Sequence, residues 1–139
     1  MQTWWIYALL SALFAALTSI LAKIGIKGVD ADVATAVRTV VILAMAWGIV
    51  LARGQGAALA HLSRHTLMFL ALSGVATGLS WIFYFRALQA GKVSLVAPID
   101  KASLAITILL SVWLLKETLS LKAAIGAGLI VAGTLVLVL

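Results

Sequence analysis

The chain of 139 residues is 65% hydrophobic and only 10% charged, and its formal net charge is +6. A soluble domain is nearer half apolar and a quarter charged, so this composition indicates an integral membrane protein with an all-α fold. The basic residues are scattered, without the basic run or aromatic–basic alternation of a nucleic-acid-binding protein, which excludes that class. Because the chain has no cysteine, disulfides, thiolate metal sites and cysteine nucleophiles are excluded as well.

Hydropathy predicts five membrane-spanning helices, each close to the roughly 20 residues that cross a bilayer. They cover residues 3–22, 32–51, 66–88, 94–115 and 119–139. The first opens with Trp4, Trp5 and Tyr7, whose aromatic rings favour the headgroup region. Residues 52–65 are predicted to be the only long loop. Its two histidines, His61 and His65, are too few for a metal site.

The second predicted span begins beside two acids and contains an arginine. Asp30 or Asp32 is suited to cap its start, where an acidic side chain accepts hydrogen bonds from free backbone N–H groups. Arg38 lies roughly 9 Å along the helix from Asp32 at about 1.5 Å per residue. Two interpretations of Arg38 stay open. Either its long stem lets the charge reach the membrane interface, or it faces the bundle and pairs with an acid such as Asp100.

The third predicted span carries a polar stripe at three- and four-residue spacing. Such a stripe either joins helices through hydrogen bonds or forms the wall of a polar path. Gly74 and Gly78 form a small-xxx-small pair on the neighbouring face, suited to close helix contact. Trp81 opens a cluster of aromatic residues that exceeds what interfacial anchoring needs, so an aromatic box for a cation or an apolar substrate is an alternative. The stripe consists of Ser73, Thr77, Ser80 and Tyr84.

The rest of the chain is organised around the fourth predicted span, which combines the only proline, Pro98, with Asp100 and Lys101. A charge near the centre of a spanning helix costs about 2.5 to 3.5 kcal/mol on an insertion scale. The default interpretation of such residues is therefore a functional site that faces protein or water. Ser103 and Thr107 share the helix face of Asp100.

Neighbouring residues on a helix point about 100° apart, so Asp100 and Lys101 are expected to have separate partners. The candidates for Asp100 are Arg38 and Lys23, whereas Lys101 is expected to meet substrate or water.

The fifth predicted span is apolar throughout and contains three glycines, Gly126, Gly128 and Gly133, which favour close packing against another helix. Five spans leave the two termini on opposite sides of the membrane. Positive charge normally sets orientation, yet four basic residues flank the spans on each side. They are Arg53, Arg64, Lys116 and Lys122 on one side, and Lys23, Lys27, Arg86 and Lys92 on the other. This balance predicts insertion in both orientations and an inverted pair of copies.

The stretch FYFRALQAGKVSLVAPIDKASLAITILLSVWLLKETLSLKAAIGAGLIVAGTLVLVL resembles the repeat unit of the drug/metabolite transporter superfamily, EamA type. The matching features are the pair Ala87-Leu88 before a short turn, the pair Ala97-Pro98 early in the next helix, and the acidic turn Lys116-Glu117-Thr118-Leu119, followed by the glycine-rich end LIVAGTLVLV. The earlier LFAALTSILAKIGIKG fits in the same order. Most such proteins carry two repeats in ten helices, and this chain resembles the single-repeat, five-helix bacterial and archaeal group.

The resemblance implies one EamA-like transmembrane domain over residues 1–139 in the plasma membrane of a bacterium or archaeon. It implies a small-molecule transporter that works by alternating access as an inverted, dual-topology homodimer, with its site near the membrane midplane between copies. The excess of basic groups favours an anionic or zwitterionic substrate. The expected partners are thus this substrate, membrane lipid and a second, antiparallel copy, and no nucleic acid, cofactor or metal is expected.

Two alternatives to a transporter of soluble small molecules stay open. One is a membrane-embedded accessory or assembly subunit without transport activity, and the other is a lipid-headgroup flippase. An enzyme is not predicted, because no activated nucleophile or metal motif is visible and only four acids are present.

Overall fold

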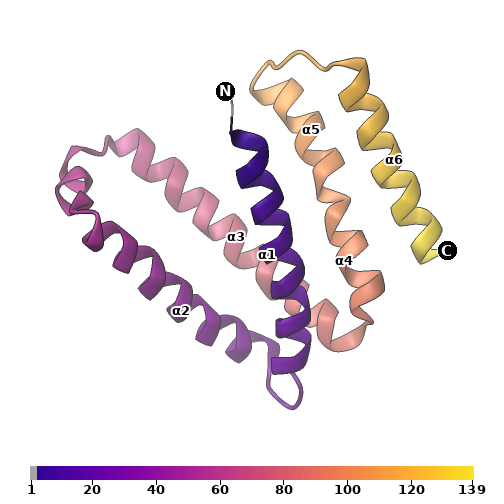
Figure 1. Cartoon of the computed structure of the whole chain (residues 1–139), viewed down its shortest axis with the longest axis horizontal. Helices are drawn as coiled ribbons and strands as arrows, with labels where there is room; N and C mark the ends of the chain where they lie inside the picture. Colours follow the sequence, from indigo (N-terminus) through magenta and orange to yellow (C-terminus); the bar gives the residue numbers. More distant parts are fainter. Residues whose placement is uncertain (1–2) are drawn as a thin grey trace. The chain divides into compact units, whose positions relative to one another are not determined.

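The computed structural model describes residues 3–139, and five helices within them are long and apolar enough to cross a membrane. The predicted all-α fold with five spans is therefore confirmed. The fourth span, Val93–Leu114, is divided into two helices (Figure 1). In chain order the elements are α1 (Trp4–Gly25), α2 (Ala31–Ala52), the 3-10 helix η1 (Gln55–His61), α3 (Arg64–Ala90), α4 (Val93–Lys101), α5 (Ser103–Leu114) and α6 (Leu121–Val138).

The connection between α2 and α3 is more regular than predicted. The expected loop over residues 52–65 is wrong at Gln55–His61, which forms η1. Gly54 takes the left-handed conformation with φ of 64°, which costs little without a Cβ and turns the chain out of α2. The following run of alanine and leucine has good helix propensity, so it continues as a short helix instead of an irregular loop.

The described helices belong to two compact units, Leu21–Gln89 and Met1–Ile20 with Ala90–Leu139. We call the first the hairpin unit, because α2 and α3 make up most of it, and the second the C-terminal unit. Each is described by itself.

In the hairpin unit, a small core lies where the end of α1, the start of α2 and the end of α3 meet. Ile26, Ala31 and Phe85 are buried there, and Ala22 and Ala34 pack against them. The alanines let the backbones approach closely, as small residues do in membrane helices. Gly28, with φ of 74°, reverses the chain between α1 and α2.

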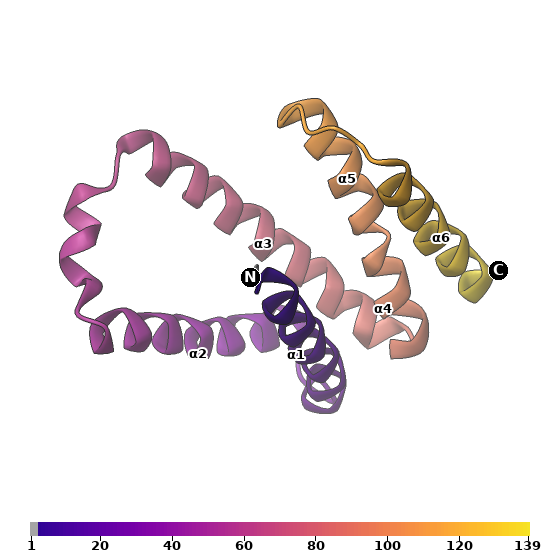
Figure 2. The same ribbon diagram turned by 45° about the horizontal axis from the view of Figure 1, so that its top comes forward.

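In the C-terminal unit, α6 packs against both α4 and α5, and the two views agree that it runs beside them (Figures 1 and 2). The hydroxyl of Thr134 on α6 donates to the carbonyl of Pro98 on α4 at 3.2 Å, and also to its own helix at Ile130. Ser120 caps the start of α6 by accepting from the N–H of Ala123 at 3.1 Å. Few side chains in either unit are buried, and large apolar ones such as Trp113 and Val136 are exposed, as expected of surfaces that meet lipid.

Candidate functional site

The hairpin unit places the guanidinium of Arg38 over two aromatic rings of α3. The Cζ atom of Arg38 lies 4.2 Å from the ring centroid of Trp81 and 4.9 Å from that of Phe85. Trp81 and Phe85 are four residues apart, so they lie on one face of α3. Tyr84 is half-buried beside them and packs edge-on against Phe85, with 6.5 Å between ring centroids. The structure thus gives Arg38 a third arrangement, a cation–π cluster across the hairpin.

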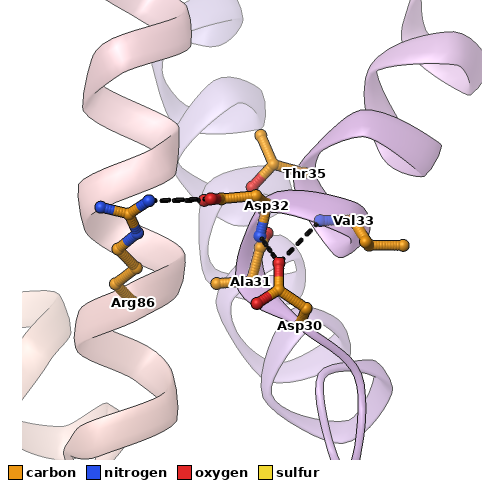
Figure 3. Close-up of polar contacts among 6 residues, drawn as sticks. All are labelled: Asp30, Ala31, Asp32, Val33, Thr35 and Arg86. Carbon is orange, nitrogen blue, oxygen red and sulfur yellow. Dashed lines mark hydrogen bonds and ion pairs between the residues drawn. The ribbon is translucent and has the colours of Figure 1, made fainter.

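Nearer the membrane edge of the same unit, Arg86 and Asp32 form an ion pair (Figure 3). The Nη2 atom of Arg86 donates to Oδ2 of Asp32 at 2.8 Å and to Oδ1 at 3.1 Å. Asp30 instead caps α2, accepting from the backbone N–H groups of Asp32 and Val33. The prediction that Asp30 or Asp32 caps this helix is confirmed, with Asp30 in that role.

Further contacts close the hairpin unit at the same end. The ammonium of Lys23 donates to the carbonyl of Leu88, and the side-chain amide of Gln89 donates to the carbonyl of Val29. Together with the pair of Arg86 and Asp32, they tie the α1–α2 turn to the end of α3.

Both acidic side chains of the hairpin unit are therefore engaged, Asp30 in the cap and Asp32 with Arg86. Within residues 3–139, the guanidinium of Arg38 forms no ion pair and donates no hydrogen bond. It is half-buried against the rings of Trp81 and Phe85, neither of which offers a hydrogen-bond acceptor.

In the C-terminal unit, the fourth span is interrupted beside its charged residues. α4 ends at Lys101 and α5 begins at Ser103. The ammonium of Lys101 lies 3.2 Å from Oδ2 of Asp100. The expectation that Asp100 and Lys101 have separate partners is thus wrong within this unit, because the long lysine stem reaches the neighbouring carboxylate. The pairing of Asp100 with Arg38 or Lys23 would join the two units and stays a prediction.

This break lies beside an open groove of about 660 Å³ in the same unit. One wall is the small-residue face of α1, including Ser11, Ala15 and Ser19, and the other comes from α4 with Pro98 and Lys101. The Lys101 side chain is 53% exposed and the Asp100 side chain 35%. The groove is therefore apolar along most of its walls, with one cation that is accessible to a ligand.

The threonines of the two polar stripes bond within their own helices. Thr77 donates to the carbonyl of Ser73 on α3, and Thr107 donates to that of Ser103 on α5, both at 2.9 Å. These four side chains and that of Ser80 are exposed. Because the protons of Thr77 and Thr107 are bonded within their own helices, these two hydroxyls donate to no other helix among the described residues. Their oxygens are still able to accept hydrogen bonds.

The candidate packing glycines make no close contact inside the chain. A Cβ atom added at any of these positions would meet no atom within 4 Å. Close packing of these glycines against a second chain stays a prediction. The positions concerned are Gly74, Gly78, Gly126, Gly128 and Gly133.

Two contacts near the candidate sites were not predicted. Neither the pair of Asp32 and Arg86 nor the bond from Thr134 to Pro98 followed from sequence spacing, because each joins different helices. The one available signal was that an arginine and an aspartate flank the predicted ends of neighbouring spans.

The sequence profile of the EamA-like transporter family matches residues 2–139. The chain belongs to the EamA-like transporter family. It is 47% identical over 136 residues to the "Uncharacterized transporter in cobO 3'region" of a Sinorhizobium species, an alignment that covers 98% of this chain and 96% of that protein. It is also 38% identical over 71 residues to the "Uncharacterized protein MJ1333.1" of Methanocaldococcus jannaschii, covering 51% of this chain and 52% of that protein. No solved structure matches the chain.

Family membership confirms the resemblance of the sequence and the prediction of a multi-pass cell-membrane protein. An EamA-like transporter moves a small molecule across the membrane. In the structure of this EamA-like chain, two basic residues inside the spans are candidates for binding a ligand. They are Arg38, against the aromatic face of α3, and Lys101, at the break of the fourth span.

Proposed function

We propose that this EamA-like chain is a non-enzymatic transporter of an anionic or zwitterionic small molecule and works by alternating access as an inverted, dual-topology homodimer. The observation that carries the proposal is the interrupted fourth span, with Asp100 and Lys101 at the break beside a groove. The break lies near the middle of Val93–Leu114. Transporters commonly place their substrate sites at this depth, on helices that are broken there.

The ion pair supports a mechanism in which an anionic group of the substrate replaces Asp100 as the partner of Lys101. In the empty state, Asp100 balances the charge of Lys101, which lowers the cost of a cation in an apolar groove. An anionic group of the substrate takes the place of Asp100 at the accessible ammonium. The exchange keeps a counter-ion at Lys101 at every stage.

The candidate translocation residues include polar and aromatic side chains of several helices. Exposed hydroxyl oxygens offer weak acceptors along a path, and aromatic rings shape it and exclude water. The candidates are Arg38, Ser73, Thr77, Trp81, Tyr84, Pro98, Asp100, Lys101, Ser103 and Thr107.

The inverted homodimer is supported by the balance of basic residues around the spans. Four lie at each side, and two copies of opposite orientation reproduce the inverted repeats of larger transporters. The open groove is consistent with a site whose remaining wall comes from a second copy.

The proposal is tested by flux in proteoliposomes with a panel of radiolabelled amino acids and monocarboxylates. We expect uptake of at least one compound above that of empty liposomes, and loss of that uptake in Lys101→Ala with helix content and elution unchanged. Lys101→Ala leaves Asp100 without its partner. The double variant Asp100→Asn with Lys101→Ala is therefore the control for the effect of an unpaired acid. Flux that survives neutralisation of Lys101, Asp100 and Arg38 together would refute the charged-site mechanism.

Two other outcomes point to the alternative functions. Assembly with a larger membrane partner that Lys101→Ala abolishes, without any flux by the wild type, indicates an accessory subunit. Transfer of a fluorescent phospholipid between leaflets of the same proteoliposomes, without solute uptake, indicates a flippase.

A further inference from the structure

The guanidinium of Arg38 is a charge within a membrane span that no acid of its own unit neutralises. It lies about seven residues inside α2, roughly 10 Å from the start of the helix. The hairpin unit contains two acids, and both are bound elsewhere. An unneutralised charge at this depth is costly, and ionisable residues kept in spans generally mark a substrate or ion path.

The guanidinium of Arg38 contacts two aromatic rings and forms no hydrogen bond within residues 3–139. Trp81 and Phe85 approach Cζ at 4.2 and 4.9 Å, the distances of a cation over a ring. The N–H donors of a guanidinium lie in its plane, in a fork that matches the two oxygens of a carboxylate. The rings therefore hold the side chain in place, while its N–H donors form no hydrogen bond among the described residues.

We infer that Arg38, in contact with Trp81 and Phe85, binds the carboxylate of the transported molecule through paired N–H···O bonds, at a step distinct from its exchange at Lys101. The inference rests on the proposed transport function and specifies the substrate class of its site. Aromatic residues of α3 were predicted to bind a cation. In the structure they contact the chain's own cation, Arg38, and this cation in turn selects an anion.

Charge balance favours a monovalent anion over a dianion. One guanidinium neutralises one negative charge, and two nearby cations are engaged: Lys23 bonds the carbonyl of Leu88, and Arg86 bonds Asp32. Lys27 lies exposed in the turn between α1 and α2. A phosphate monoester would bring almost two charges into an apolar site. The phosphodiester of a lipid headgroup is monovalent too, but Arg38 lies across the hairpin against α3 instead of extending towards the interface.

The test is equilibrium binding of radiolabelled benzoate to the purified full chain in an uncharged maltoside detergent without phospholipid. Benzamide, the neutral counterpart of the same shape, serves as the control competitor. We expect saturable benzoate binding that benzamide does not displace. Arg38→Gln is expected to weaken it by about tenfold or more, as for a lost charge-assisted pair, and Arg38→Lys by less. Trp81→Leu is expected to weaken it without removing the charge.

The matched control is Arg53→Lys, which changes an exposed guanidinium of the same unit and keeps its charge. We expect unchanged benzoate affinity in this variant, and unchanged helix content and elution in all of them. Equal benzoate affinity in wild type and Arg38→Gln, or no saturable binding by the wild type, would overturn the inference. Displacement of benzoate by added phosphatidylcholine in the wild type but not in Trp81→Leu would assign Arg38 to a lipid phosphate and also overturn it.

The benzoate experiment and the flux experiment fail independently. Binding that depends on Arg38 without any flux would retain the anion site and refute transport. Flux that persists in Arg38→Gln, with no benzoate binding, would retain transport and refute the carboxylate assignment.

Discussion

Asp30 and Asp32 lie two residues apart and have different roles, which the structure separates. Asp30 accepts two backbone N–H groups at the start of α2, whereas Asp32 reaches across to Arg86 on α3. We expect Asp30→Ala to lower the free energy of unfolding by about 1 kcal/mol, the usual cost of losing an N-cap. Thermal unfolding in detergent measures it.

The control for this cap is Asp30→Asn, which keeps an acceptor oxygen at the same position and removes the charge. Its stability should stay near that of the wild type, because asparagine is as good an N-cap as aspartate. Equal destabilisation by the two substitutions would show that the charge, and not the cap, stabilises this end of α2.

Individual residues show which features of the structure could be predicted from the sequence and which could not. A cap by Asp30 or Asp32 is a local feature and followed from the chain, and so did the unusual status of Arg38 and Lys101 in apolar spans; the structure assigns the cap to Asp30. The stacking of Arg38 on Trp81 depends on which faces of α2 and α3 meet, and spacing within one helix does not fix this. Regular helix geometry argued against the pairing of Lys101 with Asp100, yet both residues lie in α4 and the flexible lysine stem reaches the neighbouring carboxylate.

At the scale of elements, the fourth span is the part whose form matters most for function. Its composition predicted one membrane span over residues 94–115 with a helix-breaking proline inside it, and the structure divides this span after Lys101. Pro98 lacks the N–H that would bond the carbonyl one turn earlier, which weakens the helix just before the break. The bond from Thr134 then holds the Pro98 carbonyl against α6.

We expect Pro98→Ala to stabilise the folded chain and to slow transport. The new N–H group restores an intrahelical bond, so the free energy of unfolding should rise by up to about 3 kcal/mol. A straighter and stiffer span should hinder rearrangement at Asp100 and Lys101, which lowers flux. Thermal unfolding and proteoliposome flux of the same preparation measure both. Greater stability with undiminished flux would contradict a role of the break in transport.

At the scale of the whole molecule, the glycine positions test the homodimer. Side chains added at Gly74 and Gly78 meet open space within the chain, so they should leave its fold intact. If these glycines pack against a second copy, Gly74→Leu with Gly78→Leu should reduce the crosslinked dimer severalfold. Gly48→Leu on α2 is the matched control, because it also meets nothing within 4 Å. Equal dimer yields in both variants would remove these glycines from the interface.

The inverted dimer depends on the orientation in which the chain inserts into the membrane. Because the basic residues are balanced between the two sides, a few substitutions should set this orientation. Lys27 and Lys92 are exposed on one side, and Arg53 and Arg64 on the other. We expect Lys27→Gln with Lys92→Gln to give one orientation, and Arg53→Gln with Arg64→Gln to give the opposite one, because cytoplasmic sides keep the positive excess. Labelling of single cysteines at Thr3 and Leu139 from each side of the membrane measures this, without background from native cysteines.

Expressed alone, each biased variant should lose most of its flux, and expressed together the two should recover it, since only the mixture supplies both orientations. The wild type should show each label on both sides. A wild type found in one orientation, or full flux from one biased variant alone, would rule out the inverted homodimer. Transport would then require a parallel oligomer or a related chain of opposite orientation.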